Sequence, residues 1–368
     1  MRLVDLFCGT GGFSRGAHMA GFRVAAAFDI DDILTSSYMA NFPETKLVRY
    51  DVSKLSAEQV EFEAGGRVDG IFGGPPCQGF SDIGRRDITD ARRKLLWHFF
   101  RLVREVQPTF FVMENVRGLL YPENIGELEA AIAHVSDIYE VPEPHIWDAS
   151  HFGAATKRNR LFVVGVHRDR GDAVTSKDIA AWKRPAATVR QALADLADAS
   201  FLESDQDGFD WWKIEKLGRP HEYARPLRIR EGDFVGRFTG HRSTLHTHKV
   251  VERFAAVPQG GLEKVGRHPR LSWDGLCPTL RAGTGADRGS YQSVRPIHPE
   301  EHRVITIREG ARLQGFPDYH KFHPTVWHSF RMIGNSVSPI MAQAVFQAVA
   351  AKLSIGSSRI GAYSVAAE

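Results

Sequence analysis

The sequence predicts an α/β protein with a doubly wound sheet as its main domain and a second, smaller, irregular domain. Two observations support this prediction. As far as about residue 167, short apolar segments alternate with helical ones, which is the rhythm of strand–helix–strand units. From residue 168 the rhythm stops, and residues 200–300 are rich in glycine, arginine, histidine and aromatic residues. The 368 residues are enough for one large domain and a smaller one.

The first expected strand leads into a glycine-rich turn. Residues 3–7 read as a buried strand, Cys8-Gly9-Thr10-Gly11-Gly12 as the turn, and residues 13–20 as a helix. Such a turn lets a ligand approach the backbone at the N-terminus of a helix. Because Gly12 directly follows Gly11, the turn departs from the dinucleotide pattern G-x-G-x-x-G, which favours an adenosyl ligand without a pyrophosphate.

Two further expected strands end in aspartates. Residues 23–28 are followed by Asp29, and residues 46–50 by Asp51. Each aspartate alone is weak evidence for a cofactor site, because aspartates at strand ends often only cap helices. The ordered series of glycine turn, Asp29 and Asp51 favours an adenosine-containing cofactor, with Asp29 where ribose hydroxyls are bound.

A cysteine follows the apolar pair Ile71-Phe72 on a stiffened loop. Two prolines restrict the backbone before Cys77, and Gly79 frees it afterwards. On this loop alone, a buried structural cysteine is an equally good interpretation. A second apolar strand, 110–113, ends in Glu114 at the same edge of the expected sheet. A thiol beside a carboxylate describes a nucleophile with an acid partner.

Six segments in order resemble the motifs of bacterial-type DNA (cytosine-5-)-methyltransferases, from Leu3 to about Val345. They are residues 5–12, 74–78, 114–116, 157–162, 303–318 and 334–337. One pair departs from the pattern, since Ala155-Thr156 stands where the family usually has Pro-Gln. The resemblance therefore predicts the arginines that follow this pair, but not the packing of its loop.

The resemblance implies a Rossmann-like, S-adenosylmethionine-dependent methyltransferase without a metal. Its substrate is a cytosine flipped out of a specific sequence in double-stranded DNA, since the base cannot react inside the stack. Cys77 adds to C6 of the base, and Glu114, holding a proton, binds the N3/N4 edge. Arg160 contacts the O2 side, and residues 81–93 form the lid.

Two supporting roles complete the implied catalytic site. Arg158 holds Glu114 or the phosphates, and Asn115 pins the backbone of Pro76-Cys77. In the cofactor site, Ile30 packs on the adenine and Asp51 accepts from its amino group. The implied cofactor-binding residues are Phe7, Gly9, Thr10, Gly11, Gly12, Asp29, Ile30, Asp51, Val52, Pro76, Leu95, Asn335, Ser336 and Val337.

The irregular interval carries an excess of basic residues. Between Lys216 and Arg253 there are nine Lys and Arg against four Asp and Glu, with several aromatic residues nearby. Composition alone fits a solvated basic domain as well as a nucleic-acid face. In the family, this interval is the target-recognition domain. We expect phosphate or base contacts among Arg219, Arg225, Arg228, Arg230, Arg237 and Arg242, and structural or phosphate roles rather than metal binding for His241, His246 and His248.

The expected domains are 1–167, completed by a C-terminal helix over 330–353, and a recognition domain over 168–320, with a flexible tail over 354–368. The net charge of +3 permits a polyanionic partner without requiring one. The three cysteines, Cys8, Cys77 and Cys277, form no metal-ligand pair or disulfide framework.

Nothing at the N-terminus resembles a signal peptide, and no apolar run is long enough to span a bilayer. We expect a monomer in the reduced cytoplasm, near the nucleoid, of a prokaryote or encoded by a phage. Two rival classes remain at this point. One is an RNA cytosine-5 methyltransferase on the same fold, and the other is a non-catalytic DNA-binding or adenosine-binding module.

Overall fold

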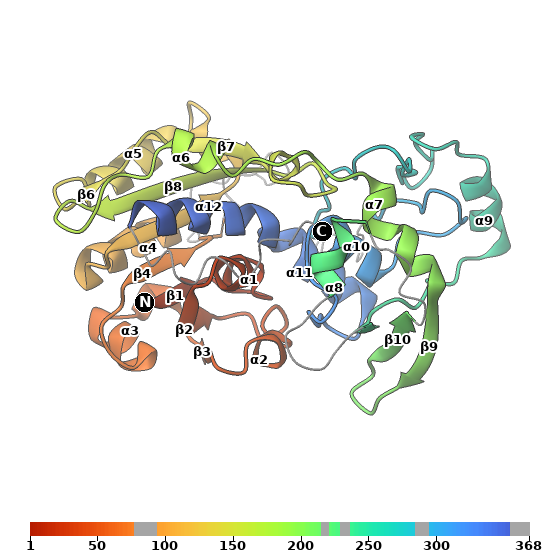
Figure 1. Cartoon of the computed structure of the whole chain (residues 1–368), viewed down its shortest axis with the longest axis horizontal. Helices are drawn as coiled ribbons and strands as arrows, with labels where there is room; N and C mark the ends of the chain where they lie inside the picture. The colour runs from red at the N-terminus through yellow and green to blue at the C-terminus, as the bar shows by residue number, and fades with distance from the viewer. Residues whose placement is uncertain (77–93, 215–220, 229–235, 284–293, 354–368) are drawn as a thin grey trace, which may run out of the picture.

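An eight-stranded sheet occupies one half of the molecule, and a three-stranded sheet with short helices occupies the other (Figure 1). The structure, a computed structural model, describes residues 1–76, 94–214, 221–228, 236–283 and 294–353. The strand order of the large sheet is β3-β2-β1-β4-β5-β8-β6, with β7 also paired to β8. This is a doubly wound order, so the predicted fold class is confirmed.

The strands of the large sheet are β1 (Arg2–Leu6), β2 (Arg23–Asp29), β3 (Lys46–Arg49), β4 (Gly70–Gly73), β5 (Phe110–Asn115), β6 (Tyr139–Glu140), β7 (His145–Asp148) and β8 (Asn159–His167). Those of the small sheet are β9 (Ala199–Ser204), β10 (Asp210–Ile214) and β11 (Arg237–Thr239).

The α-helices are α1 (Gly12–Met19), α2 (Tyr38–Asn41), α3 (Ala57–Ala64), α4 (Lys94–Val106), α5 (Ile125–Ala133), α6 (Ser176–Ala180), α7 (Val189–Leu193), α8 (Ala224–Arg228), α9 (His248–Ala255), α10 (Ile307–Leu313), α11 (Val326–Asn335) and α12 (Pro339–Lys352). Short 3-10 turns are η1 (Val52–Lys54), η3 (Arg117–Leu120), η4 (Ala149–His151) and η5 (Ala194–Asp198).

The side on which successive strands are added to the sheet changes between β1 and β4. Strands β1 to β3 build outward on one side, and β4 and β5 continue on the other, all parallel. A Cβ atom at Gly73 would overlap the carbonyl oxygen of Leu6, so only glycine allows β1 and β4 to approach in this way. In such sheets, ligands bind at the carboxyl ends of the strands at this switch point.

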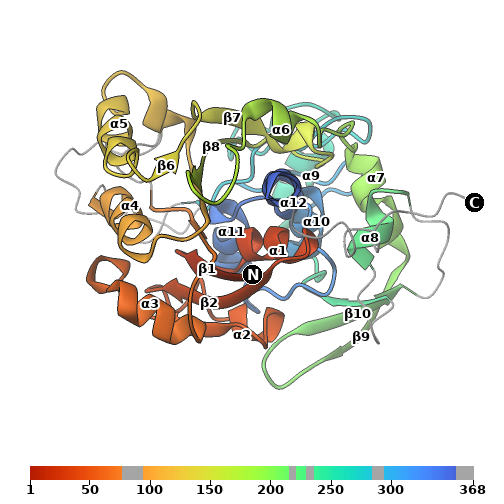
Figure 2. The ribbon, with the colours of Figure 1, turned by 60° about the vertical axis from the view of Figure 1, so that its left-hand side comes forward.

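Helices cover both faces of the large sheet (Figures 1 and 2). On one face, α1 and α12 share an apolar core with β4, β5 and β8. On the other face, α3, α4 and α5 pack against the same sheet. Gly16 allows the close contact of the first pair, because a Cβ atom there would overlap Ala342.

The prediction of one C-terminal helix over 330–353 is wrong. Two helices, α11 and α12, are separated by Ser336–Ser338. Proline favours the first position of a helix, and Pro339 begins α12 there. Phe330 and Ile333 of α11 pack in the apolar core of the second half of the chain, whereas α12 packs on the large sheet. Only α12 therefore completes the first domain.

Buried arginines hold the second half together beside its apolar core. Arg312 is fully buried, and its Nε and Nη2 atoms donate to the two carboxylate oxygens of Asp318 at 2.6 Å each. Its Nη1 donates to Asp195 at 3.2 Å, which also pairs with Arg228. The packing of α10 therefore depends on these charged partners as well as on its apolar residues Ile307, Ala311 and Leu313.

We expect Arg312→Met to lower the free energy of unfolding by about 3–5 kcal/mol, because the buried carboxylate of Asp318 loses both of its hydrogen bonds from the guanidinium. Urea denaturation followed by circular dichroism measures this. The matched control is Arg190→Met, which removes an exposed pair with Asp274 and is expected to cost less than about 1 kcal/mol. Equal losses in the two variants would contradict a special role for the buried pair.

Candidate functional site

The carboxyl ends of β4 and β5 are tied together by one side chain. Asn115 Nδ2 donates to the carbonyl of Pro75 at 3.2 Å, and Asn115 Oδ1 accepts from Val116 N at 2.9 Å. The predicted contact with Pro76-Cys77 therefore falls one residue earlier. It fixes the loop immediately before Cys77. Cys77 itself and the expected lid, 81–93, lie outside the described residues.

Glu114 is held by an ion pair at this edge of the sheet. Strand β8 runs antiparallel to β5, and Arg160 Nε lies 2.6 Å from Glu114 Oε1. Burial raises the pKa of Glu114, against the opposing charges of Arg160 and Arg158. The carboxyl therefore keeps its proton to a higher pH than a free glutamic acid would. A protonated carboxyl can donate a hydrogen bond to a ring nitrogen.

Arg158 binds backbone rather than phosphate. Its Nη2 donates to the carbonyl of Gly334 at 2.8 Å and its Nη1 to that of Leu280 at 3.2 Å. The side chain is buried, so the expectation of a phosphate contact is wrong. Its positive charge still acts on Glu114, because it opposes part of the rise in the pKa of Glu114 that burial causes.

The glycine turn folds around one carbonyl of β2. The amides of Phe7 and Cys8 both donate to Phe28 O, at 2.9 and 3.1 Å. Phe7 adopts a φ of +68°, so β1 ends one residue earlier than predicted. Gly9 N donates to Asp29 Oδ2 at 2.9 Å, and a Cβ atom at Gly9 would have no neighbour within 4 Å. The turn thus presents open space in which a ligand can approach the backbone.

Asp29 and Ile30 border this space. Asp29 Oδ1 accepts from Asp31 N at 2.9 Å, so each carboxylate oxygen has one amide donor and can accept another hydrogen bond. Burial raises the pKa of Asp29. The Ile30 side chain is exposed. Further hydrogen-bond acceptors beside an exposed apolar side chain fit the ribose hydroxyls and the base of an adenosyl group.

The neighbouring strand brings Asp51 close to Asp29. Tyr50 N donates to Asp29 O at 3.0 Å, and Asp51 Oδ1 accepts from Ser53 N at 3.0 Å. Hydrogen bonds from Ser53 lower the pKa of Asp51, which favours its charged form. Val52 is buried beside it. The predicted adenosine-binding residues therefore lie on adjacent strand ends.

The other glycines of the turn are needed for packing. A Cβ atom at Gly11 would overlap the Phe42 ring, and one at Gly12 would overlap Ser336 and crowd Val337 O. This brings two predicted residues, Ser336 and Val337, against the turn; Asn335, which precedes them, is exposed. Thr10 is buried, with its hydroxyl 3.4 Å from His320 Nε2. Pro76 and Leu95 lie beside the two ends of the undescribed segment 77–93.

Three features of the site were not predicted from the sequence. Asp31 forms an ion pair with Arg331 beside Ile30, and no local pattern signals a contact between residues 300 positions apart. Asp5, below the turn, accepts from Ser14, and burial raises its pKa well above the usual value. Gly74 leaves room for Glu114, since a Cβ atom there would lie 2.9 Å from Glu114 Oε2.

The six candidate DNA-binding arginines divide into groups. Arg219 and Arg230 lie outside the described residues. Arg228 is buried and paired with Asp195, so its predicted role in DNA binding is wrong. Three others reach the surface, and Arg225 is exposed. Arg237 pairs with Glu203 and stacks on Trp211. Arg242 donates to Ser204 and stacks on Phe201.

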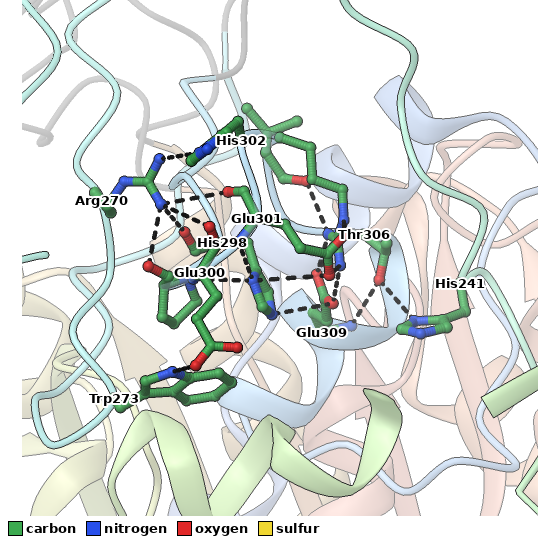
Figure 3. Close-up of polar contacts among 12 residues, drawn as sticks. His241, Arg270, Trp273, His298, Glu300, Glu301, His302, Thr306 and Glu309 are labelled. Carbon is green, nitrogen blue, oxygen red and sulfur yellow. Dashed lines mark hydrogen bonds and ion pairs between the residues drawn. The ribbon is translucent and has the colours of Figure 1, made fainter. Parts of the chain in front are cut away.

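Two of the three histidines named in the sequence analysis contact residues far along the chain, and the third, His248, lies 3.4 Å from Glu252 one turn along α9. His241 Nδ1 lies 3.1 Å from the hydroxyl of Thr306, at the start of α10 (Figure 3). His246 Nε2 accepts from Val304 N at 3.3 Å. Within the described ranges, no group of three or more His, Cys, Asp or Glu side chains is placed to hold a metal ion. None of the described helices has the length and apolar composition needed to cross a membrane.

The sequence profile of C-5 cytosine-specific DNA methylases matches residues 1–351. The chain belongs to this family. It is 39% identical over 364 residues to the Type II methyltransferase M.XorII of Xanthomonas oryzae pv. oryzae, covering 93% of this chain and 82% of that protein. It is 29% identical to M.DdeI of Desulfomicrobium norvegicum over 389 residues, covering 95% of this chain and 88% of that one.

Solved structures agree with this assignment. A crystal structure described as a prophage-encoded DNA modification methyltransferase from E. coli superposes with a TM-score of 0.82 at 38% identity, covering 96% of this chain and 99% of that one. The S. pombe Dnmt2 methyltransferase shares the fold with a TM-score of 0.64 at 18% identity, covering 95% and 98%. This chain is a DNA cytosine-5 methyltransferase that uses S-adenosylmethionine, as the sequence predicts.

We expect Gly74→Ala to lower the methylation rate by about 100-fold, because the new Cβ atom displaces the carboxyl that faces it and small misplacements are costly. Single-turnover kinetics measure this, with cofactor affinity and thermal stability unchanged. The control is Gly126→Ala on α5, where a Cβ atom meets nothing within 4 Å. Wild-type activity in Gly74→Ala would show that Glu114 tolerates the displacement.

We expect Asp29→Ala to weaken S-adenosylmethionine binding by about 1.5–3 kcal/mol, the value of hydrogen bonds to a charged group. Titration calorimetry measures the affinity. Asp32→Ala is the control, since Asp32 is an exposed aspartate three residues away that pairs with Arg49. Unchanged affinity in Asp29→Ala would exclude the ribose contact.

Proposed function

We propose that this enzyme methylates C5 of one cytosine in a specific double-stranded DNA sequence through a covalent bond to Cys77. The observation that supports this most is the buried Glu114–Arg160 pair beside a loop that Asn115 holds at Pro75. This pair provides an acid and a cation close to Gly74, three residues before Cys77 in the chain. These are the groups that addition of a thiolate to cytosine requires.

The thiolate of Cys77 adds to C6 of the base, and the electron pair of the C5–C6 bond becomes available at C5. Glu114 donates its proton toward N3, where negative charge develops, and Arg160 stabilises the O2 side. S-adenosylmethionine supplies the methyl group that C5 takes. Water removes the C5 proton, the electron pair of that C–H bond restores the C5–C6 double bond, Cys77 leaves as the thiolate, and the N3 proton returns to Glu114.

We assign catalysis and DNA sequence recognition to different halves of the chain. We assign the reaction to residues 1–167 with α12, and the reading of sequence to residues 168–320. Surface arginines of the second half that stack on Trp211 and Phe201 support this assignment. The named relatives are Type II methyltransferases, which favours a role beside a restriction enzyme. We propose that the enzyme acts as a monomer in the prokaryotic cytoplasm.

The test is transfer of labelled methyl groups to plasmid DNA and to transfer RNA, followed by bisulfite sequencing. We expect label on DNA alone, at one sequence, and none with Cys77→Ser, whose hydroxyl is a much weaker nucleophile than a thiolate. Cofactor binding by this variant is expected to be near wild type. Label on RNA alone would overturn the choice of substrate.

A duplex containing 5-fluorocytosine tests the covalent step separately. Fluorine cannot leave as a proton, so wild-type enzyme is expected to remain attached to the DNA, with the adduct mapped to Cys77 by mass spectrometry. Cys277→Ser is the control, because burial raises the pKa of that thiol to about 12 and keeps it protonated. An adduct formed by Cys77→Ser would exclude Cys77 as the nucleophile.

A further inference from the structure

An ion pair joins the cofactor edge of the large sheet to helix α11. Arg331 on α11 donates through Nη2 to Asp31 Oδ2, and Asp31 directly follows Asp29 and Ile30 in the chain. The Arg331 and Asp31 side chains are 30% and 25% exposed, so most of the pair is shielded from water. Salt screens such a pair less than a fully exposed one.

Asp31 also holds the backbone around it. Its Oδ1 accepts from the amides two and three residues later, at 3.0 and 2.9 Å, while Oδ2 is bonded by Arg331. Its own amide donates to Asp29 Oδ1 at 2.9 Å. A movement of Asp31 would therefore displace the carboxylate of Asp29 and the side chain of Ile30, which lies between them in the chain.

Helix α11 is a firm support for Arg331. Ile333 of this helix is buried in the apolar core of the second half, and Leu34, from the segment that follows Asp31, packs against the same core. The end of the helix is held as well, because Arg158 Nη2 donates to the carbonyl of Gly334 at 2.8 Å. The ion pair thus ties the segment after β2 to a helix whose position is fixed by the core.

A second ion pair in the same segment is far more exposed. Arg49 Nε lies 3.2 Å from Asp32 Oδ1, and these side chains are 51% and 76% exposed. Exposed pairs of this kind contribute little to a structure. The Arg49–Asp32 pair therefore serves as a matched control for the pair between Arg331 and Asp31.

We propose that Arg331 is a positioning residue for S-adenosylmethionine. Through Asp31 it holds Asp29 and Ile30 in the places where the ribose and the adenine bind. The inference rests on the predicted ribose contact of Asp29, which Asp29→Ala tests on its own, and cofactor binding can be measured without DNA. A segment that is already in place binds a ligand without the entropy cost of ordering it.

The test measures binding of S-adenosylmethionine to the full chain by titration calorimetry. We expect Arg331→Met to bind about tenfold more weakly, as for a segment that is correctly placed in about one-tenth of the molecules. Arg331→Lys keeps the positive charge and is expected to remain within about threefold of wild type. Arg49→Met is expected to match wild type. Unchanged affinity in Arg331→Met, or an equal loss in Arg49→Met, would overturn the proposal.

Asp31→Asn tests the route of the effect. Asparagine keeps an oxygen for the two backbone amides and removes the charge with which Arg331 pairs. If Arg331 acts through Asp31, the double variant Asp31→Asn/Arg331→Met is expected to bind no more weakly than the weaker single variant. Losses that add in the double variant would contradict this route.

Methylation kinetics give a second readout. In Arg331→Met, KM for S-adenosylmethionine is expected to rise about tenfold while kcat stays within about twofold, which is the pattern for lost ground-state binding. A fall in kcat at saturating cofactor with KM unchanged would overturn a positioning role at the cofactor.

A ribose analogue separates positioning from a general loss of structure. We expect wild-type enzyme to bind S-adenosylhomocysteine about tenfold more tightly than its analogue without ribose hydroxyls, because Asp29 accepts hydrogen bonds from them. Arg331→Met is expected to lose most of this preference, whereas a merely destabilised protein would keep it. A preference as large as that of wild type would therefore overturn the proposal, and a wild-type enzyme without any preference would refute the ribose contact and the inference with it.

Discussion

The buried guanidinium of Arg158 joins the parts of the chain that form the site. Arg158 lies immediately before β8 and donates to the carbonyl of Leu280, in the second half, and to that of Gly334, near the end of α11. Arg160, two residues farther along and within β8, pairs with Glu114. One short segment at the start of β8 thus contacts the second half through Arg158 and the Glu114 carboxyl through Arg160. Burial makes both contacts obligatory, because an unpaired charge would be costly there.

The second half depends on charges to a degree that the first does not. Arg308, fully buried, donates to the carbonyls of Thr239, Pro317 and His320, which connects the small sheet to the segment under the glycine turn. Arg270 gathers the carbonyls of residues 298–301 in the same way (Figure 3). Long loops held by guanidinium groups can present polar and apolar tips in fixed positions. That suits a surface that reads DNA.

Much of the first half was predictable because its strands are short and apolar. Glycines or carboxylate side chains that can bind a ligand follow these strands directly. The glycine turn, Asp29, Asp51 and Glu114 all stand at strand ends, and parallel strands bring their carboxyl ends to one edge. The role of Arg158 was predicted only in part, because its burial depends on residues more than 120 positions away. Arg228 was misassigned for the same reason, since a basic composition does not reveal which cations face inward.

The sequence by itself determined the fold class, the glycine turn and the family. These depend on short local patterns of apolar residues, glycines and motif residues, whose spacing follows from the geometry of strands and turns. Only the tertiary structure decided which arginines are structural, where the C-terminal segment breaks into α11 and α12, and why Gly11, Gly12 and Gly74 are glycines. Each of these depends on contacts between segments far apart in the chain. Such contacts are set by three-dimensional packing and by the need to satisfy buried charges, and no local pattern encodes them.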